Sequence, residues 1–75
     1  MINYLIDIDG TITDDVPNEE PLRMIVCVPF TGAVEKINAW YSEGHCITFF
    51  TSRTEDLRKI TEDWLSLWGF KYHNL

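Results

Sequence analysis

Apolar residues gather in short runs that predict a small set of strands. Residues 3–8 and 45–50 are apolar with little alternation, which is typical of strands buried on both faces of a parallel sheet. Residues 70–72 begin a third run near the end of the chain. We therefore expect two central strands and the start of a third.

Two segments with helical periodicity separate these runs. Residues 32–43 repeat apolar side chains every three or four positions, after Thr31 as a candidate N-cap and before Gly44 as a stop. A second helix is predicted from Thr54 to Gly69, on the apolar stripe of Leu57, Ile60, Trp64, Leu65 and Trp68. Residues 11–21 are polar and acidic and predict a loop, and residues 24–28 predict a short extended segment.

The alternation of strand and helix predicts an α/β fold. Strand, helix, strand, helix, strand is the pattern of right-handed crossovers in a parallel sheet. We expect a truncated three-layer Rossmann-like sheet, with ligands bound at the carboxyl ends of the strands. An edge and apolar helix faces would stay uncovered, so association with another copy or with a further C-terminal segment is expected.

Size and charge limit the classes of function. Seventy-five residues make one domain, and a hydrophobic share of 45% is enough for a core. The net charge of −6 offers no basic surface for nucleic acid and disfavours an anionic membrane. No apolar run approaches the ~20 residues that span a bilayer. Cys27 and Cys46 are expected to be free thiols in the cytoplasm.

Two carboxylates at the end of the first strand are the main candidate for chemistry. Asp7 and Asp9 are two positions apart, so they point the same way if the strand continues, and Gly10 allows a sharp turn after them. Such a pair suits a cation and a phosphate. A solvated acidic turn is the simpler alternative. A calcium loop is excluded, because positions six and twelve counted from Asp7 are Ile12 and Asn18.

The sequence Asp-Ile-Asp-Gly-Thr at residues 7–11 resembles motif I of the haloacid dehalogenase-like hydrolases. Residues 47–53 resemble motif II of that family, in which an apolar strand ends at a Ser or Thr that holds the phosphoryl group. The order and spacing of the two segments fit the family over most of the chain. The interval between them is too short for a large inserted cap domain.

The resemblance implies a mechanism. Asp7 would be the nucleophile that forms an aspartyl-phosphate, and Asp9 would be the general acid and base. Mg²⁺ would be held by Asp7 and Asp9. The substrate phosphate would be bound by the residues that surround these acids, namely Gly10, Thr11, Thr51, Ser52 and Arg53.

The resemblance is confined to the N-terminal part of the family's pattern. Residues 1–75 would form one domain with motifs I and II, and the family's motif III Lys and motif IV acids have no counterpart. The function implied is a magnesium-dependent phosphatase acting on a small phosphorylated metabolite, such as a sugar phosphate or nucleotide. The alternative is a non-catalytic binding or assembly module, or a truncated inactive relative.

Overall fold

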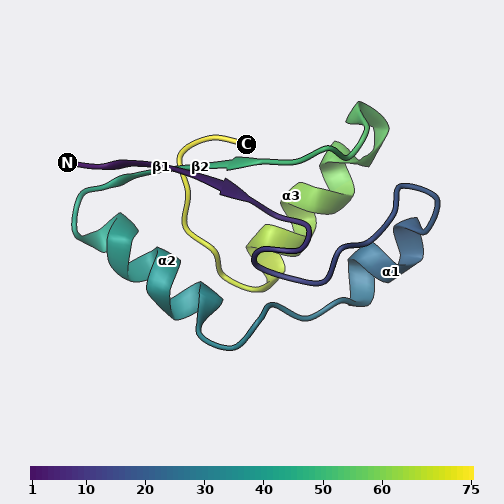
Figure 1. Cartoon of the computed structure of the whole chain (residues 1–75), viewed down its shortest axis with the longest axis horizontal. Coiled ribbons are helices and arrows are strands. Elements are labelled where there is room, and N and C mark those ends of the chain that lie inside the picture. Colours follow the sequence, from purple (N-terminus) through teal and green to yellow (C-terminus); the bar gives the residue numbers. More distant parts are fainter.

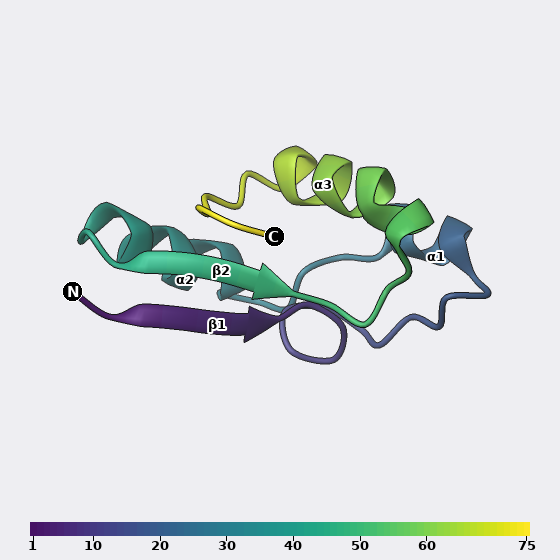
Figure 2. The same ribbon diagram turned by 90° about the horizontal axis from the view of Figure 1, so that it is seen from above.

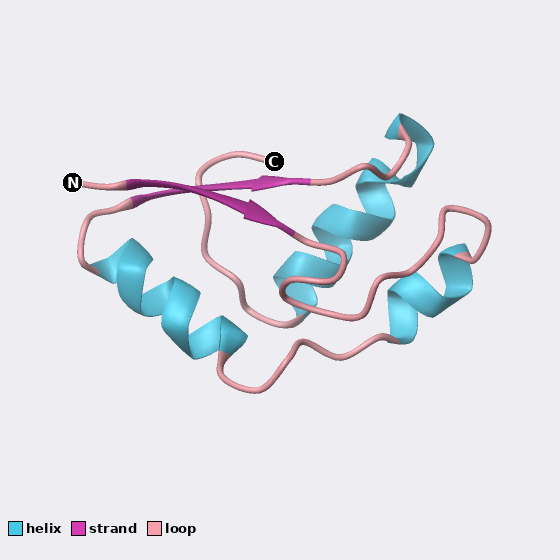
Figure 3. Cartoon of the chain, viewed as in Figure 1, coloured by secondary structure: helices cyan, strands magenta, loops and turns pink.

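The computed structural model describes all 75 residues and contains two strands and three α-helices (Figure 1). A short 3₁₀ helix, η1, precedes the last α-helix, and loops connect the other elements (Figure 3). In chain order the elements are β1 (Asn3–Asp7), α1 (Pro21–Val26), α2 (Ala33–Ser42), β2 (Cys46–Phe50), η1 (Glu55–Leu57) and α3 (Arg58–Leu67). None of the helices is long and apolar enough to cross a membrane.

The two strands form a parallel pair. Their register runs from Asn3 beside Cys46 to Asp7 beside Phe50. Both strands were predicted from their apolar runs, and both are confirmed. The third strand expected from residue 70 is wrong. After α3 the chain forms one isolated parallel bridge with β2, between Thr48 and Asn74. There the Phe49 N–H donates to the Asn74 carbonyl at 2.9 Å and the His73 N–H donates to the Ile47 carbonyl at 2.8 Å.

α2 and α3 lie on the same side of this sheet, which Figure 1 shows edge-on, and α1 lies beyond the ends of the strands, against α3. Tyr4 of β1 stacks on Trp40 of α2, with ring centroids 4.1 Å apart. Phe49 of β2 packs edge-on against Phe70, which follows α3. Residues in register on parallel strands point to the same face, so the remaining positions face away from the helices. Figure 2 looks onto that uncovered face.

The predicted three-layer Rossmann-like sheet is therefore wrong. Three layers need helices on both faces of the sheet, and this domain has two strands with helices on one face. The apolar run of residues 3–8 suggested burial on both faces. In the structure its odd positions face outward, and Leu5 is 73% exposed.

The predicted extended segment at residues 24–28 is also wrong, because residues 21–26 form the helix α1. Pro21 is the first residue of α1. Its fixed φ suits a helix, and the backbone N–H that it lacks would have no partner within the helix at this position. Met24 of this helix is fully buried against Val16 and Leu57. A single buried side chain therefore anchors α1, which leaves most of its surface exposed.

The other two predicted helices are confirmed. α2 begins after Gly32, which adopts a left-handed φ of 85°, and no side chain caps it. The last helical segment begins after Thr54 as η1 and continues as α3. The main core joins the sheet to both helices and consists of Ile6, Ile8, Ile12, Ile37, Ile47, Phe49, Trp64, Leu65 and Phe70.

Candidate functional site

The carboxyl ends of the two strands lie side by side and form the candidate site. The Ile8 N–H donates to the Phe50 carbonyl at 3.2 Å, which extends the pairing one residue beyond β1. The chain then turns sharply at Gly10, whose φ is 80° and whose N–H donates to the Thr13 carbonyl at 2.8 Å. A left-handed φ of this kind is available to glycine at little cost. The turn follows Asp9 immediately and separates it from the loop.

Asp9 is held by Arg53 in a buried ion pair. The Arg53 Nη2 donates to Asp9 Oδ1 at 2.8 Å, and its Nε donates to Oδ2 at 3.0 Å and to Oδ1 at 3.2 Å. The exposed fractions of the two side chains are 8% for Asp9 and 2% for Arg53. The guanidinium binds the carboxylate in a bidentate manner, which is the strongest hydrogen-bonding geometry for an Arg–carboxylate ion pair.

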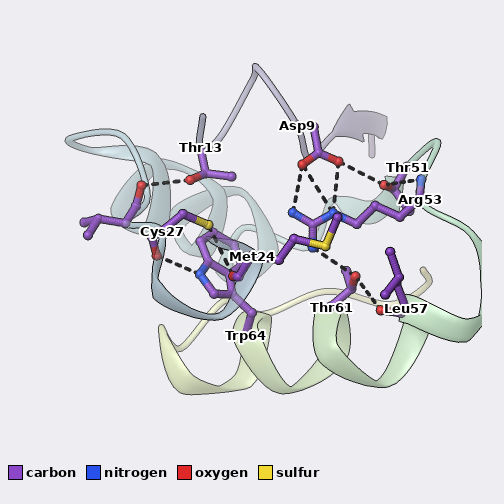
Figure 4. A network of polar contacts seen from close by, with 10 residues as sticks. Asp9, Thr13, Met24, Cys27, Thr51, Arg53, Leu57, Thr61 and Trp64 are labelled. Carbon is purple, nitrogen blue, oxygen red and sulfur yellow. Dashed lines mark hydrogen bonds and ion pairs between the residues drawn. The ribbon is translucent and has the colours of Figure 1, made fainter. Parts of the chain in front are cut away.

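Two threonines extend the pair into a network (Figure 4). Thr51 Oγ1 donates to Asp9 Oδ2 at 3.2 Å and accepts the Arg53 backbone N–H at 3.1 Å. Thr61 of α3 accepts from Arg53 Nη1 at 3.0 Å and donates to the Leu57 carbonyl at 3.0 Å. The network therefore ties the ends of both strands to α3.

Asp7 lies in different surroundings. Its carboxylate is half-buried and makes no hydrogen bond or ion pair with another group of the protein. It borders a mostly apolar groove of about 490 Å³ between β1 and α2, together with Thr11 and Lys36. The two carboxylates of the motif therefore differ: Asp9 is committed to protein partners, and Asp7 is available to a ligand.

The remaining predicted site residues lie around these two acids. Arg53 and Thr51 contact Asp9 directly, as described above. Thr11 and Ser52 are exposed, and neither side chain makes a hydrogen bond within the protein. Gly10 supplies the turn. The catalytic, phosphate-binding and metal-binding roles assigned to all of these residues stay predictions.

Thr61 is a member of the network that the sequence analysis missed. It is 1% exposed and lies on the buried stripe of α3, four residues after Leu57. A polar residue on an apolar helical stripe was the available signal, because a buried hydroxyl needs a hydrogen-bond partner. The partner itself could not be read from the sequence.

The side chains present do not assemble a metal site. No group of three or more His, Cys, Asp or Glu residues is placed to hold a metal ion. Asp9 already accepts four hydrogen bonds, three from Arg53 and one from Thr51. Of the two acids of the motif, only Asp7 has no partner in the protein, and a single carboxylate could hold Mg²⁺ only together with waters or substrate oxygens. Magnesium at Asp7 and Asp9 therefore stays a prediction, and no step below depends on it.

Two side chains outside the network have shifted pKa values. The hydrogen bond from Lys59 to Asp63 and the charge of that carboxylate raise the pKa of Lys59. Burial raises the pKa of Tyr72. Neither residue contacts Asp7 or Asp9, so these shifts do not bear on the site.

Comparison with known proteins gives a fold likeness without a family. No family model matches the sequence, and no curated protein matches it. A chain in a solved structure titled "Structure of Pnkp1/Rnl/Hen1 complex" is similar in fold, with a TM-score of 0.83 and 18% sequence identity. The likeness covers 100% of this chain and 27% of that chain. At this identity the match shows the fold alone.

These comparisons correct the family assignment made from the motifs. The resemblance to the haloacid dehalogenase-like hydrolases finds no support in a family model, and the structural match is to a component of the Pnkp1/Rnl/Hen1 complex. The assignment is therefore wrong. Residues 7–11 have a local explanation in the structure, because Asp9 pairs with Arg53 and Gly10 makes the turn that follows. Two short segments, residues 7–11 and 47–53, were too little to establish a family.

Proposed function

We propose that the chain binds a phosphate monoester at the carboxyl ends of β1 and β2 and hydrolyses it with Asp7 as the nucleophile. The observation that carries this proposal is the unpartnered carboxylate of Asp7, half-buried beside the exposed hydroxyl-bearing loops. Because this carboxylate has no hydrogen-bond or ion-pair partner in the protein, it is available to a ligand. Strand ends are also where parallel sheets bind their ligands.

The proposed reaction has two steps. An Asp7 oxygen attacks phosphorus, the ester P–O bond breaks, and the leaving alkoxide takes a proton from water. Water then attacks the aspartyl-phosphate, which returns the Asp7 carboxylate and releases inorganic phosphate. Covalent catalysis of this kind divides one difficult hydrolysis into two easier steps.

In this proposal Asp9 and Arg53 have a supporting role. Their ion pair fixes the end of β2, where Phe50 lies beside Asp7 and is followed by Thr51 and Ser52. The Arg53 side chain is 2% exposed and its charge is paired with Asp9, so it is not free to bind a phosphate. Lys36, an exposed cation, borders the same groove as Asp7 and is the positive group available to a phosphate there.

Hydrolysis of p-nitrophenyl phosphate by the wild-type chain, with and without added Mg²⁺, tests this function. Turnover is expected in the wild type and not in Asp7→Asn, whose amide cannot form the covalent intermediate. Asp14→Asn is the matched control, because Asp14 is an exposed acid of the following loop. Mass spectrometry of the quenched reaction should find one added phosphoryl group in the wild type alone. Full turnover in Asp7→Asn would reject Asp7 as the nucleophile.

A non-catalytic module is the second candidate. It is favoured by the fold match, which places a similar domain in about a quarter of a longer chain from a complex of three named components. The ion pair between Arg53 and Asp9 also agrees with a role of this motif in stabilising the fold. This candidate predicts no turnover under any of the conditions above and no difference between the two variants.

A further inference from the structure

The largest group of exposed apolar side chains lies away from the candidate site, on α1 and the end of α3. We call it the α1–α3 patch and define it as Leu22, Ile25, Val26, Val28, Leu67 and Trp68, which are between 38% and 77% exposed. α1 and α3 lie against one another, and the chain between α1 and α2 passes below them in Figure 1. Ile25 and Leu67 line one hollow and Val28 and Trp68 line another, so both segments contribute side chains to the same surface.

The patch has both raised and hollow parts. Leu22 and Val26 are four residues apart on one side of α1, and both are more than 70% exposed. A hollow of about 200 Å³ lies between Ile25 and Leu67, and another of about 220 Å³ lies between Val28 and Trp68. Leu67 and Trp68, which border the two hollows, are consecutive residues at the end of α3.

We propose that the α1–α3 patch is the interface of a twofold dimer of this chain. In a twofold interface the same patch meets itself, so a surface with a ridge beside a hollow can be its own complement. At exposed fractions of 38% to 77%, the six residues expose on the order of 600 Å² together. A standard interface buries about 800 Å² on each partner, so the patch would form its apolar centre and the surrounding residues would supply the remainder.

The other exposed apolar surface fits this role less well. On the bare face of the sheet only Leu5 and Phe50 are large and apolar, and Asp7 and Thr48 lie between them. Covering that face would also close the ends of the strands, where the proposed site lies. The α1–α3 patch can be buried while that site stays open.

The net charge of the chain permits a dimer when salt screens the repulsion between the two copies. The basic residues beside the patch are paired within the chain, Arg23 with Glu20 and Lys59 with Asp63. Of the acids that line the two hollows, Asp63 is the one paired with Lys59, and Glu35 makes no ion pair. Each copy has a net charge of −6, so the whole molecules repel each other. Salt screens that repulsion, so the dimer should become tighter as the salt concentration rises. An interface held by ion pairs would instead become weaker.

Sedimentation equilibrium of the full chain at low and high salt tests the proposal. Val26→Lys is the test variant, and Leu5→Lys is the matched control, because the two side chains are 72% and 73% exposed and lie on opposite parts of the molecule. A lysine near the end of α1 suits the helix dipole, so the fold should be kept. A twofold interface contains Val26 twice, and we expect the dissociation constant to rise about tenfold for each copy, about a hundredfold in all.

Leu5→Lys should leave the dissociation constant within about threefold of the wild type. Dimers that tighten with salt and are lost in Val26→Lys would support the proposal. A chain that stays monomeric to millimolar concentration at high salt would overturn it, and a different partner would then have to cover the patch. A dimer that Leu5→Lys weakens as much as Val26→Lys does would overturn it as well.

Discussion

Asp9 and Asp7 are two residues apart in the sequence, and the structure uses them in opposite ways. Asp9 is buried, accepts four hydrogen bonds and joins both strand ends to α3 through Arg53. Asp7 is half-buried beside a groove and has no partner in the protein. One region of the site is thus closed and neutralised, and the other is open and charged.

The difference follows from where the strand ends. β1 ends at Asp7, and the chain bends through Ile8 before Gly10 completes the turn. Asp9 therefore leaves the regular alternation of the strand and meets Arg53, which follows β2. Two identical side chains in one motif can consequently have separate uses, one in stability and one in ligand binding. The variants below measure that separation.

Removal of Arg53 should have the largest effect on the closed region. Arg53→Ala would leave the buried Asp9 carboxylate without its cation, and the loss of one partner of a buried pair costs about 3–5 kcal/mol. The free energy of unfolding in urea measures it. Arg23→Ala is the control, because Arg23 forms an exposed pair with Glu20 and should cost less than about 1 kcal/mol. Similar values for the two variants would mean that the Asp9 pair is not structural.

Thr61 should show a smaller effect through the same network. Thr61→Val keeps the shape but removes the hydroxyl between Arg53 and the Leu57 carbonyl, at a cost of about 1–3 kcal/mol. Thr61→Ser keeps the hydroxyl and loses one methyl group, so it should cost less than about 1 kcal/mol. Urea unfolding of both variants checks this. A Ser variant as unstable as the Val variant would assign the effect to packing alone.

The sequence predicted the secondary structure well where the apolar pattern was long. β1, β2, α2 and α3 all follow from runs of at least five residues or from a repeated helical stripe. α1 was missed because six residues with one buried side chain, Met24, show no clear period. The layer arrangement was missed for another reason. An apolar strand does not reveal whether a helix covers its second face, and Leu5 is exposed.

The sequence predicted that the candidate residues lie at neighbouring strand ends, but it did not predict that Asp9 and Arg53 form an ion pair. Residue order placed Asp9, Thr51 and Arg53 at neighbouring strand ends, and the structure brings these three together. That Arg53 would face Asp9 depends on the turn at Gly10 and on the hydroxyl of Thr61 in α3. Both are tertiary features, and spacing along the chain does not show them.

The central claim is that Asp9 holds the fold while Asp7 is free for a ligand, and urea unfolding of Asp7→Asn and Asp9→Asn tests it most directly. The two substitutions are chemically identical. Asp9→Asn should lower the free energy of unfolding by about 3 kcal/mol, because Arg53 loses its buried counter-charge. Asp7→Asn should change it by no more than about 0.5 kcal/mol, because no group in the protein depends on that carboxylate. Equal losses in the two variants would contradict the account.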